Sequence, residues 1–306
     1  MYRFLGLFLL VILSVACATQ PPYNASAIQS DAPVLTKEYW YDGSAEINTY
    51  ALKQNRYNTL HDGTAMLIFV TEDFLTDTQV KNDRYQNKNS TSVLKKIEQR
   101  KFNTGVYDYT MYSTIFTPVE INQYKKSLKV VGSLQDWCGT IYHQYNAQKN
   151  GYKVTGHSYF ESEGEQNVTV SSGIHEGELY TRLRMNPELL PIGIFDIIPE
   201  PIVGMMKHYP LLSYSAEASV SNYNGKLKGG NLKTYTVTVP DLERTLEIVY
   251  EAAAPFKIVA FYDSYPSAFD KQMRTTAAEL INHTKMPYWN KNNPSDAELR
   301  TALRLD

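Results

Sequence analysis

The chain has 306 residues, of which 30 are basic and 32 acidic, so its formal net charge is −2 at pH 7. This balance gives no indication of binding to nucleic acid or to anionic lipid, since both favour clusters of basic residues. The length is sufficient for one large domain, or two modest ones, with a sizeable core.

Residues 1–16 have the pattern of a secretory signal peptide. Arg3 supplies the positive charge, and the apolar run that follows is too short to span a bilayer. The run ends in Leu-Ser-Val-Ala-Cys at 13–17, which resembles the lipobox of bacterial lipoproteins. That resemblance implies cleavage before Cys17 and acylation of this residue. The triplet Ala16-Cys17-Ala18 also fits the A-x-A site of ordinary signal peptidase, so both processing routes stay open.

Residues 17–36 are expected to form a lipidated flexible tether, because they contain three prolines and several polar residues but little to bury. The residues directly after Cys17 lack the acidic cluster that sends lipoproteins to the cell surface in some bacteria. We therefore expect a protein of the cell envelope, anchored at the periplasmic face of the outer membrane.

Residues 37–306 have the composition of a single antiparallel β domain, with 24 tyrosines in the whole chain and many runs of Val, Ile and Thr. Strands follow one another without long helical crossovers, which favours antiparallel pairing. So many strands must close or curl to protect their edges, which predicts a large, open or incomplete β-barrel. By fold-level analogy, it would be similar to the half-barrel lipid carriers of the periplasm. Outside the central hairpin, we expect strands at 38–50, 64–72, 105–116, 127–132, 176–185, 212–223, 232–239, 245–251 and 257–262.

The densest group of reactive side chains lies in the hairpin predicted at 135–165. Asn150-Gly151 indicates a two-residue type I′ turn, in which Lys149 pairs with Tyr152. In that register one face collects a candidate site for a ligand or a partner protein, and the alternative is a solvated outer face. The residues of this face are Cys138, Tyr142, His157, Tyr159, Glu161 and Glu163.

Cys138 has no disulfide partner if Cys17 is acylated, so we expect a buried and unreactive thiol. In the predicted register Cys138 and His157 are six positions apart along the ladder. That is roughly 20 Å, too far for a catalytic dyad.

The segment 186–208 combines four prolines with many apolar residues. Proline at this density argues against a central strand, and the apolar content predicts that the segment packs on the domain. It is either a crossover that caps the core or a lid over the mouth of a ligand cavity. The candidate lid residues are Leu190, Ile194, Phe195 and Ile198.

The last residues predict a short C-terminal helix, since Ser295-Asp296-Ala297-Glu298 has the form of a capping box. The stretch 268–281 fits a helix or a strand equally well. The chain contains no G-x-S-x-G elbow, H-E-x-x-H motif, P-loop or paired C-x-x-C, and its six histidines are scattered. We therefore expect no catalytic site, no metal site and no cofactor.

Several motifs, with Tyr288-Trp289, resemble a family of uncharacterised lipoproteins from Bacteroidota-type bacteria. They are EYWYDG at 38–43, FVTEDF at 69–74, WCG at 137–139 and YFESEG at 159–164. The resemblance covers most of the mature chain and implies no activity. Members sometimes carry the label of the Maf-type septum formation inhibitors, which open with a Ser-x-Ser-x-Arg phosphate-binding loop. This chain lacks that loop, so we regard the label as a naming error.

Together these features predict a non-enzymatic envelope lipoprotein whose open barrel binds an apolar or amphipathic ligand, or an envelope protein partner, in its cavity. One alternative is a hydrolase or lyase that uses Glu161 and Glu163 with Tyr159. Another is a structural assembly factor of the envelope, which the lack of a sizeable cavity would favour.

Replacing Cys17 with alanine should release the protein from the membrane into the soluble periplasm, because the lipobox offers no other residue for acylation. Metabolic labelling with a fatty-acid analogue should mark the wild-type chain and leave Cys17→Ala unlabelled. An unlabelled wild type, or a mature N-terminus at Thr19, would contradict this expectation.

Overall fold

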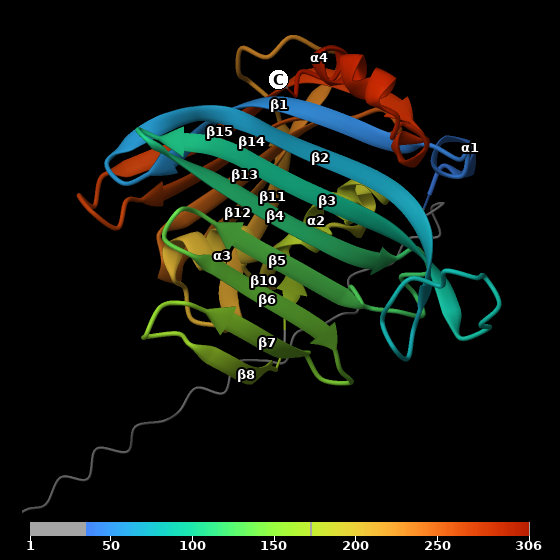
Figure 1. Cartoon of the computed structure of the whole chain (residues 1–306), viewed down its shortest axis with the longest axis horizontal. Helices are drawn as coiled ribbons and strands as arrows, with labels where there is room; N and C mark the ends of the chain where they lie inside the picture. The colour runs from blue at the N-terminus through green and yellow to red at the C-terminus, as the bar shows by residue number, and fades with distance from the viewer. Residues whose placement is uncertain (1–34, 172, 306) are drawn as a thin grey trace, which may run out of the picture.

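The computed structural model describes residues 35–171 and 173–305, which form one sheet of fifteen strands (Figure 1). Neighbouring strands run in the order β8 to β1, followed by β15 to β9. All neighbours are antiparallel except β9 and β10. The edges β8 and β9 do not pair with each other, so the expected open β-barrel is confirmed.

The first eight strands are β1 (Ala45–Arg56), β2 (Thr59–Leu75), β3 (Ser90–Thr104), β4 (Tyr107–Pro118), β5 (Lys129–Gln135), β6 (Thr140–Ala147), β7 (Tyr152–Ser158) and β8 (Glu165–Val170). The others are β9 (Ile174–His175), β10 (Gly193–Ile198), β11 (Tyr214–Asn222), β12 (Leu232–Val239), β13 (Arg244–Glu251), β14 (Ile258–Pro266) and β15 (Met273–Met286).

The helices are short, and two of them lie inside the curled sheet (Figure 1). The expected C-terminal helix is confirmed, but the capping box belongs to the 3₁₀ helix before it, where it joins Asn293 to Asp296 and does not start at Ser295. In the described part of the chain, no helix is long and apolar enough to cross a membrane. The α-helices are α1 (Lys37–Trp40), α2 (Glu176–Met185), α3 (Pro201–Lys207) and α4 (Leu299–Ala302). The 3₁₀ helices are η2 (Pro187–Leu189), η3 (Pro240–Leu242), η4 (Tyr288–Asn290) and η5 (Pro294–Glu298).

The predicted signal peptide and Cys17 lie outside the described residues. Of the predicted tether 17–36, the structure describes Leu35 and Thr36. Leu35 is buried in the main core, and the Thr36 carbonyl accepts hydrogen bonds from the amides of Tyr39 and Trp40. The folded part therefore includes two residues that the sequence placed in the tether.

Helix α2 occupies the segment 176–185, where the sequence predicted a strand, so that prediction was wrong. All ten residues of α2 are buried, and a helix buried on every side shows no amphipathic period. His175 caps the helix by accepting a hydrogen bond from the Gly177 amide at 3.3 Å. Glu178 and Arg182 form an ion pair at 2.5 Å one turn apart.

The charged residues of α2 also pair with the sheet that surrounds them. Arg244 of β13 is held by Glu176 of α2 at 2.5 Å and by Asp263 of β14 at 2.7 Å, and all three are buried. At the other end of the helix, Arg184 forms an ion pair with Glu46 of β1. These contacts join α2 to both halves of the sheet.

Strand β3 was missed by the sequence analysis because the side chains that its central part turns inward are charged, namely Lys96, Glu98 and Arg100. Lys96 lies 2.8 Å from Glu98 and 3.4 Å from Glu200, and Arg100 lies 2.7 Å from Glu98. Burial opposes ionisation of Glu98, but attraction by Lys96 and Arg100 lowers its pKa to about 2. A run rich in Lys, Glu and Arg does not indicate a strand unless these partners are known.

In the part of the chain that the structure describes, core side chains fill the interior. Side chains of α2 and α3 belong to the main hydrophobic core together with those of the surrounding strands. Two pockets, of about 580 and 330 Å³, lie on the outer face of the sheet. The ligand cavity expected inside the barrel is therefore occupied by the two helices.

The central hairpin has a different turn from the predicted one. Ala147 pairs with Tyr152, so the loop has four residues, and of its Asn-Gly pair only Gly151 has a positive φ, 86°. Each β6 residue consequently pairs two positions earlier on β7 than expected. A shift by two residues keeps every side chain on its predicted face.

The segment 186–208 enters the sheet, contrary to the expectation from its prolines. Strand β10 contains none of them and lies between β9 and β11. The prolines flank it, and Pro201 starts α3, where a proline needs no amide donor. The ambiguous stretch 268–281 belongs largely to strand β15.

Replacing Arg244 with methionine should lower the free energy of unfolding by about 3–5 kcal/mol, because Glu176 and Asp263 would stay buried without their partner. Burial already raises the pKa of Asp263 despite Arg244, and loss of the guanidinium should raise it further. The folded variant then binds a proton that the unfolded chain does not. The deficit should therefore shrink as the pH falls from neutral toward the unfolded aspartate pKa of about 4.

Chemical denaturation across this pH range measures the effect. Lys53→Met is the matched control, since it removes the exposed pair with Asp62 and should change the free energy by less than about 1 kcal/mol. Equal stability losses for Lys53→Met and Arg244→Met would contradict the assigned role of the buried cluster.

Candidate functional site

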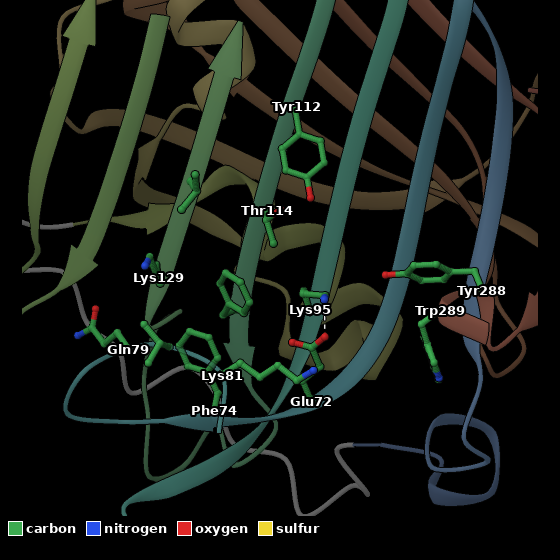
Figure 2. Close-up of a pocket in the computed structure, with 13 residues that line it drawn as sticks. Glu72, Phe74, Gln79, Lys81, Lys95, Tyr112, Thr114, Lys129, Tyr288 and Trp289 are labelled. Carbon is green, nitrogen blue, oxygen red and sulfur yellow. Dashed lines mark hydrogen bonds and ion pairs between the residues drawn. The ribbon is translucent and has the colours of Figure 1, made fainter. Parts of the chain in front are cut away.

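The larger pocket is a groove of about 580 Å³ across the outer face of strands β2 to β5 (Figure 2). Tyr112, Thr114 and Phe116 of β4 form part of its floor, with Lys129 and Val131 of β5 beside them. Alternate residues of a strand point to opposite faces. The residues between these lining positions on β4 are buried in the interior. The floor is therefore made of side chains that point outward, and the residues between them in the strand pack in the core.

One wall of the groove is the loop between β2 and β3, which folds back over the sheet. The Leu75 amide donates to the Val80 carbonyl at 2.8 Å. Gln79 donates through Nε2 to the Ala147 carbonyl at 2.9 Å and accepts from Asn146 Nδ2 at 2.8 Å. These bonds to β6 place Val80 at the rim of the groove, with Lys81 directly after it.

The opposite wall comes from the C-terminal segment that follows β15. Tyr288 and Trp289 of η4 line the groove, and their rings lie edge to face with centroids 5.4 Å apart. Tyr288 also packs on an outer cluster that includes Ile47 and Ile68. Further along, Thr49 Oγ1 donates to the Leu303 carbonyl at 2.7 Å, which attaches the C-terminus to β1.

The lining is both aromatic and cationic. Phe74, labelled in Figure 2, stacks on Phe116 with ring centroids 4.4 Å apart. Three lysines and one glutamate line the groove, which gives it a net charge of +2.

Only one of the three lysines is neutralised. Lys95 forms an ion pair with Glu72, drawn as a dashed line in Figure 2. Among the described residues, neither Lys81 nor Lys129 has an ion-pair or hydrogen-bond partner for its ammonium group. Burial lowers the pKa of Lys129, as expected for a partly desolvated cation without a counter-ion. An anionic group of a ligand would supply that missing charge.

The groove is suited to binding a molecule that carries both an apolar body and an anionic group. Its volume lies within the range of small-molecule sites, and its aromatic side chains offer apolar surface. In the described part of the chain, no three His, Cys, Asp or Glu residues lie close enough together to hold a metal ion.

The hairpin face predicted from sequence lies on the outer surface but does not form one site. Tyr142 and His157 are cross-strand neighbours with ring centroids 6.2 Å apart. Tyr159, Glu161 and Glu163 lie beyond the end of β7. His157 pairs with Glu165 at 2.6 Å, whereas Glu163 pairs with His208 at 2.6 Å. Glu163 and the imidazole of His157 therefore have separate partners.

Cys138 is exposed, so the prediction of a buried thiol was wrong. It lies in the turn between β5 and β6, where its amide donates to Asp136 Oδ1 at 2.7 Å. The predicted strand would have carried Cys138 into the hairpin ladder, but β6 starts only at Thr140.

The candidate lid residues separate in the structure. Leu190, Phe195 and Ile198 are buried in the core, whereas Ile194 on the other face of β10 is 80% exposed. None of these four residues lines the groove. Their placement matches the alternative in which this segment caps the core.

The groove residues were not singled out from the sequence, although the pair Tyr288-Trp289 was noticed. The two walls of the groove come from segments more than two hundred residues apart in the chain, so no local pattern brings them together. The outward aromatics Tyr112 and Phe116, at even spacing on one predicted strand, were the available signal.

No protein-family model and no curated protein matches the chain. It is similar to a solved structure titled as a β-barrel-like protein of the domain of unknown function DUF1849 from Brucella abortus. The TM-score is 0.41 and the sequence identity 6%, over 78% of this chain and 97% of the other. This likeness carries no functional implication.

Phe195→Ala should lower the free energy of unfolding by about 3–5 kcal/mol, because it deletes a core aromatic side chain. Ile194→Ala, one residue earlier and exposed, should change it by less than about 0.5 kcal/mol. Denaturant unfolding followed by circular dichroism measures both. Similar small effects for the two variants would show that Phe195 is not a core residue.

Proposed function

We propose that this protein is a lipid-anchored, non-enzymatic protein of the cell envelope that binds an amphipathic anion in the groove on the outer face of its sheet. The lipobox-like motif at 13–17 supports the anchor, and the expected location is the periplasmic face of the outer membrane. The groove supports the binding function.

One observation carries the proposal: Lys81 and Lys129, which have no counter-ion among the described residues, line a groove that also presents stacked aromatic rings. A lysine whose only role is solubility can lie anywhere on the surface, whereas these two lysines line an aromatic pocket. Burial in that pocket lowers the pKa of Lys129, which means that its charged form is disfavoured there. A ligand carboxylate or phosphate would relieve this cost through charge-assisted hydrogen bonds.

The alternatives receive less support from the same residues. A hydrolase based on Glu161 and Glu163 would need both carboxylates to face a common substrate, yet Glu163 is engaged by His208. A purely structural assembly factor would not need a groove of about 580 Å³. A protein partner would need a protruding segment with both an acidic and an apolar side chain to fill the groove.

The fluorescent fatty acid 11-(dansylamino)undecanoic acid should bind the purified protein, with energy transfer from Trp289 to the dansyl group. Lys129→Glu and Lys81→Glu should each weaken binding about tenfold, because each removes a charge-assisted contact. Fluorescence titration gives the dissociation constants, and oleate should displace the probe.

Lys233→Glu is the matched control, since it makes the same charge change on β12, outside the groove. It should bind like the wild type. The corresponding dansyl alcohol, which lacks the carboxylate, should bind weakly to the wild type and be insensitive to the lysine variants. Unchanged affinity of the fatty acid for both groove variants would rule out the proposed site.

A further inference from the structure

The register of the sheet fixes how the lining of the groove is arranged. Phe116 of β4 pairs with Lys95 of β3 on one side and with Lys129 of β5 on the other. Thr114 lies two residues before Phe116 on β4, and Tyr112 lies two residues before Thr114. Alternate side chains of a strand share one face, so these three β4 residues form one line along the floor. The groove therefore has cations and aromatic rings around Phe116 and hydroxyl groups toward Tyr112.

Hydroxyl groups from the floor and from the C-terminal wall point into the same space. Figure 2 shows the hydroxyls of Tyr112 and Tyr288 directed toward the ion pair of Glu72 and Lys95. Burial raises the pKa of Tyr288, and electrostatic repulsion by Glu72 and Tyr112 raises it further, as expected for groups that face one another. The segment after β15 therefore adds a polar group to the groove as well as aromatic surface.

These hydroxyls are available to a ligand. Among the described residues, no group forms a hydrogen bond with the side-chain hydroxyl of Tyr112, Thr114 or Tyr288. Each of them can donate one hydrogen bond and accept two. On the adjoining strand β6, by contrast, the Tyr142 hydroxyl donates to Gln144 Oε1 at 2.9 Å. The polar groups of the groove are thus left open, while those beside it bind each other.

The groove is also elongated. It crosses the four neighbouring strands β2 to β5. Neighbouring strands lie about 4.8 Å apart, so the floor extends over about 14 Å. Phe74 stacks on Phe116 in one part of the groove, and Trp289, which is 46% exposed, lies in the opposite wall. A ligand that spans the groove can contact aromatic rings and hydroxyl groups along its length.

A saturated acyl chain would not use this lining fully. Its carboxylate could pair with Lys81 or Lys129, but its methylene groups would cover the hydroxyls of Tyr112 and Tyr288 and displace their water. A hydroxyl that is removed from water and receives no hydrogen bond costs free energy. A ligand that carries its own hydroxyl groups beside an apolar surface avoids this cost.

We propose that the ligand of the groove is an acidic saccharide, a chain of sugar rings that carry carboxylates. This inference rests on the proposed function and narrows its amphipathic anion to one chemical class. The C–H face of a sugar ring is apolar and would lie against aromatic rings such as Trp289. The hydroxyls at the edge of the ring exchange hydrogen bonds with Tyr112 and Tyr288. The carboxylates bind Lys81 and Lys129 through charge-assisted hydrogen bonds.

Trigalacturonic acid is a suitable probe, since each of its sugar rings carries a carboxylate. Isothermal titration calorimetry with the purified full chain should show binding, and the probe should displace 11-(dansylamino)undecanoic acid. Tyr112→Phe and Tyr288→Phe should each weaken binding of trigalacturonic acid about fivefold, because each removes a hydrogen-bonding group and keeps the ring. The same two variants should bind the dansyl fatty acid at least as well as the wild type does.

Three controls separate the hydroxyl groups, the charge and the sugar ring. Tyr85→Phe removes an exposed hydroxyl that does not line the groove, and this variant should bind trigalacturonic acid like the wild type. The fully methyl-esterified trisaccharide keeps its hydroxyls but has no charge. It should bind about tenfold more weakly and be insensitive to Lys129→Glu. Propane-1,2,3-tricarboxylate has the carboxylates without a sugar ring, so its weaker binding should be insensitive to both tyrosine variants.

The outcomes distinguish this inference from the proposed function. The inference is overturned if trigalacturonic acid does not bind, or binds equally well to the wild type and to both tyrosine variants. The proposed function stands in that case, provided that the dansyl fatty acid still depends on Lys81 and Lys129. If neither probe loses affinity in Lys129→Glu and Lys81→Glu, the inference and the proposed function are both wrong.

Discussion

The structure depends on the pairing of the charges that α2 carries into the interior of the sheet. Each buried ion would cost several kcal/mol if it were left alone. Glu178 and Arg182 bind each other, and Arg184 binds Glu46. Arg244 binds both Glu176 of the helix and Asp263 of β14. Because the partners lie on strands from both halves of the sheet, the position of the helix and the curvature of the sheet are determined together. Well-packed apolar residues can give as much stability as such ion pairs. The distinctive contribution of the ion pairs is therefore that they fix one position of the helix in the sheet.

This filled interior decides where the protein can meet other molecules. An open barrel suggests a ligand cavity at its centre, but here α2 and α3 take that space with core side chains. The surfaces that remain are the outer face and the ends of the strands. The groove uses the outer face between the β2–β3 loop and Trp289.

Local patterns predicted the parts of the chain whose neighbours lie close in sequence. Strand β12 was predicted at its observed bounds, since it is a run of alternating β-formers between clear turn signals. The faces of the central hairpin were also correct, because side chains alternate with period two even when the turn has four residues and not two. The same reasoning failed at Cys138, where the strand ends before the thiol and leaves it exposed.

Local patterns are sufficient for the class of the fold: many alternating strands with short turns must pair antiparallel, and too many of them to lie flat must curl. The remaining features depend on contacts between distant segments. Whether the segment 176–185 becomes a helix or a strand depends on partners such as Arg244, which follows almost sixty residues later. Whether Lys129 lines a site depends on Trp289, which reaches it only through the return of the chain after β15. The buried ion pairs and the walls of the groove are both contacts between distant segments. No pattern within one segment can therefore predict them.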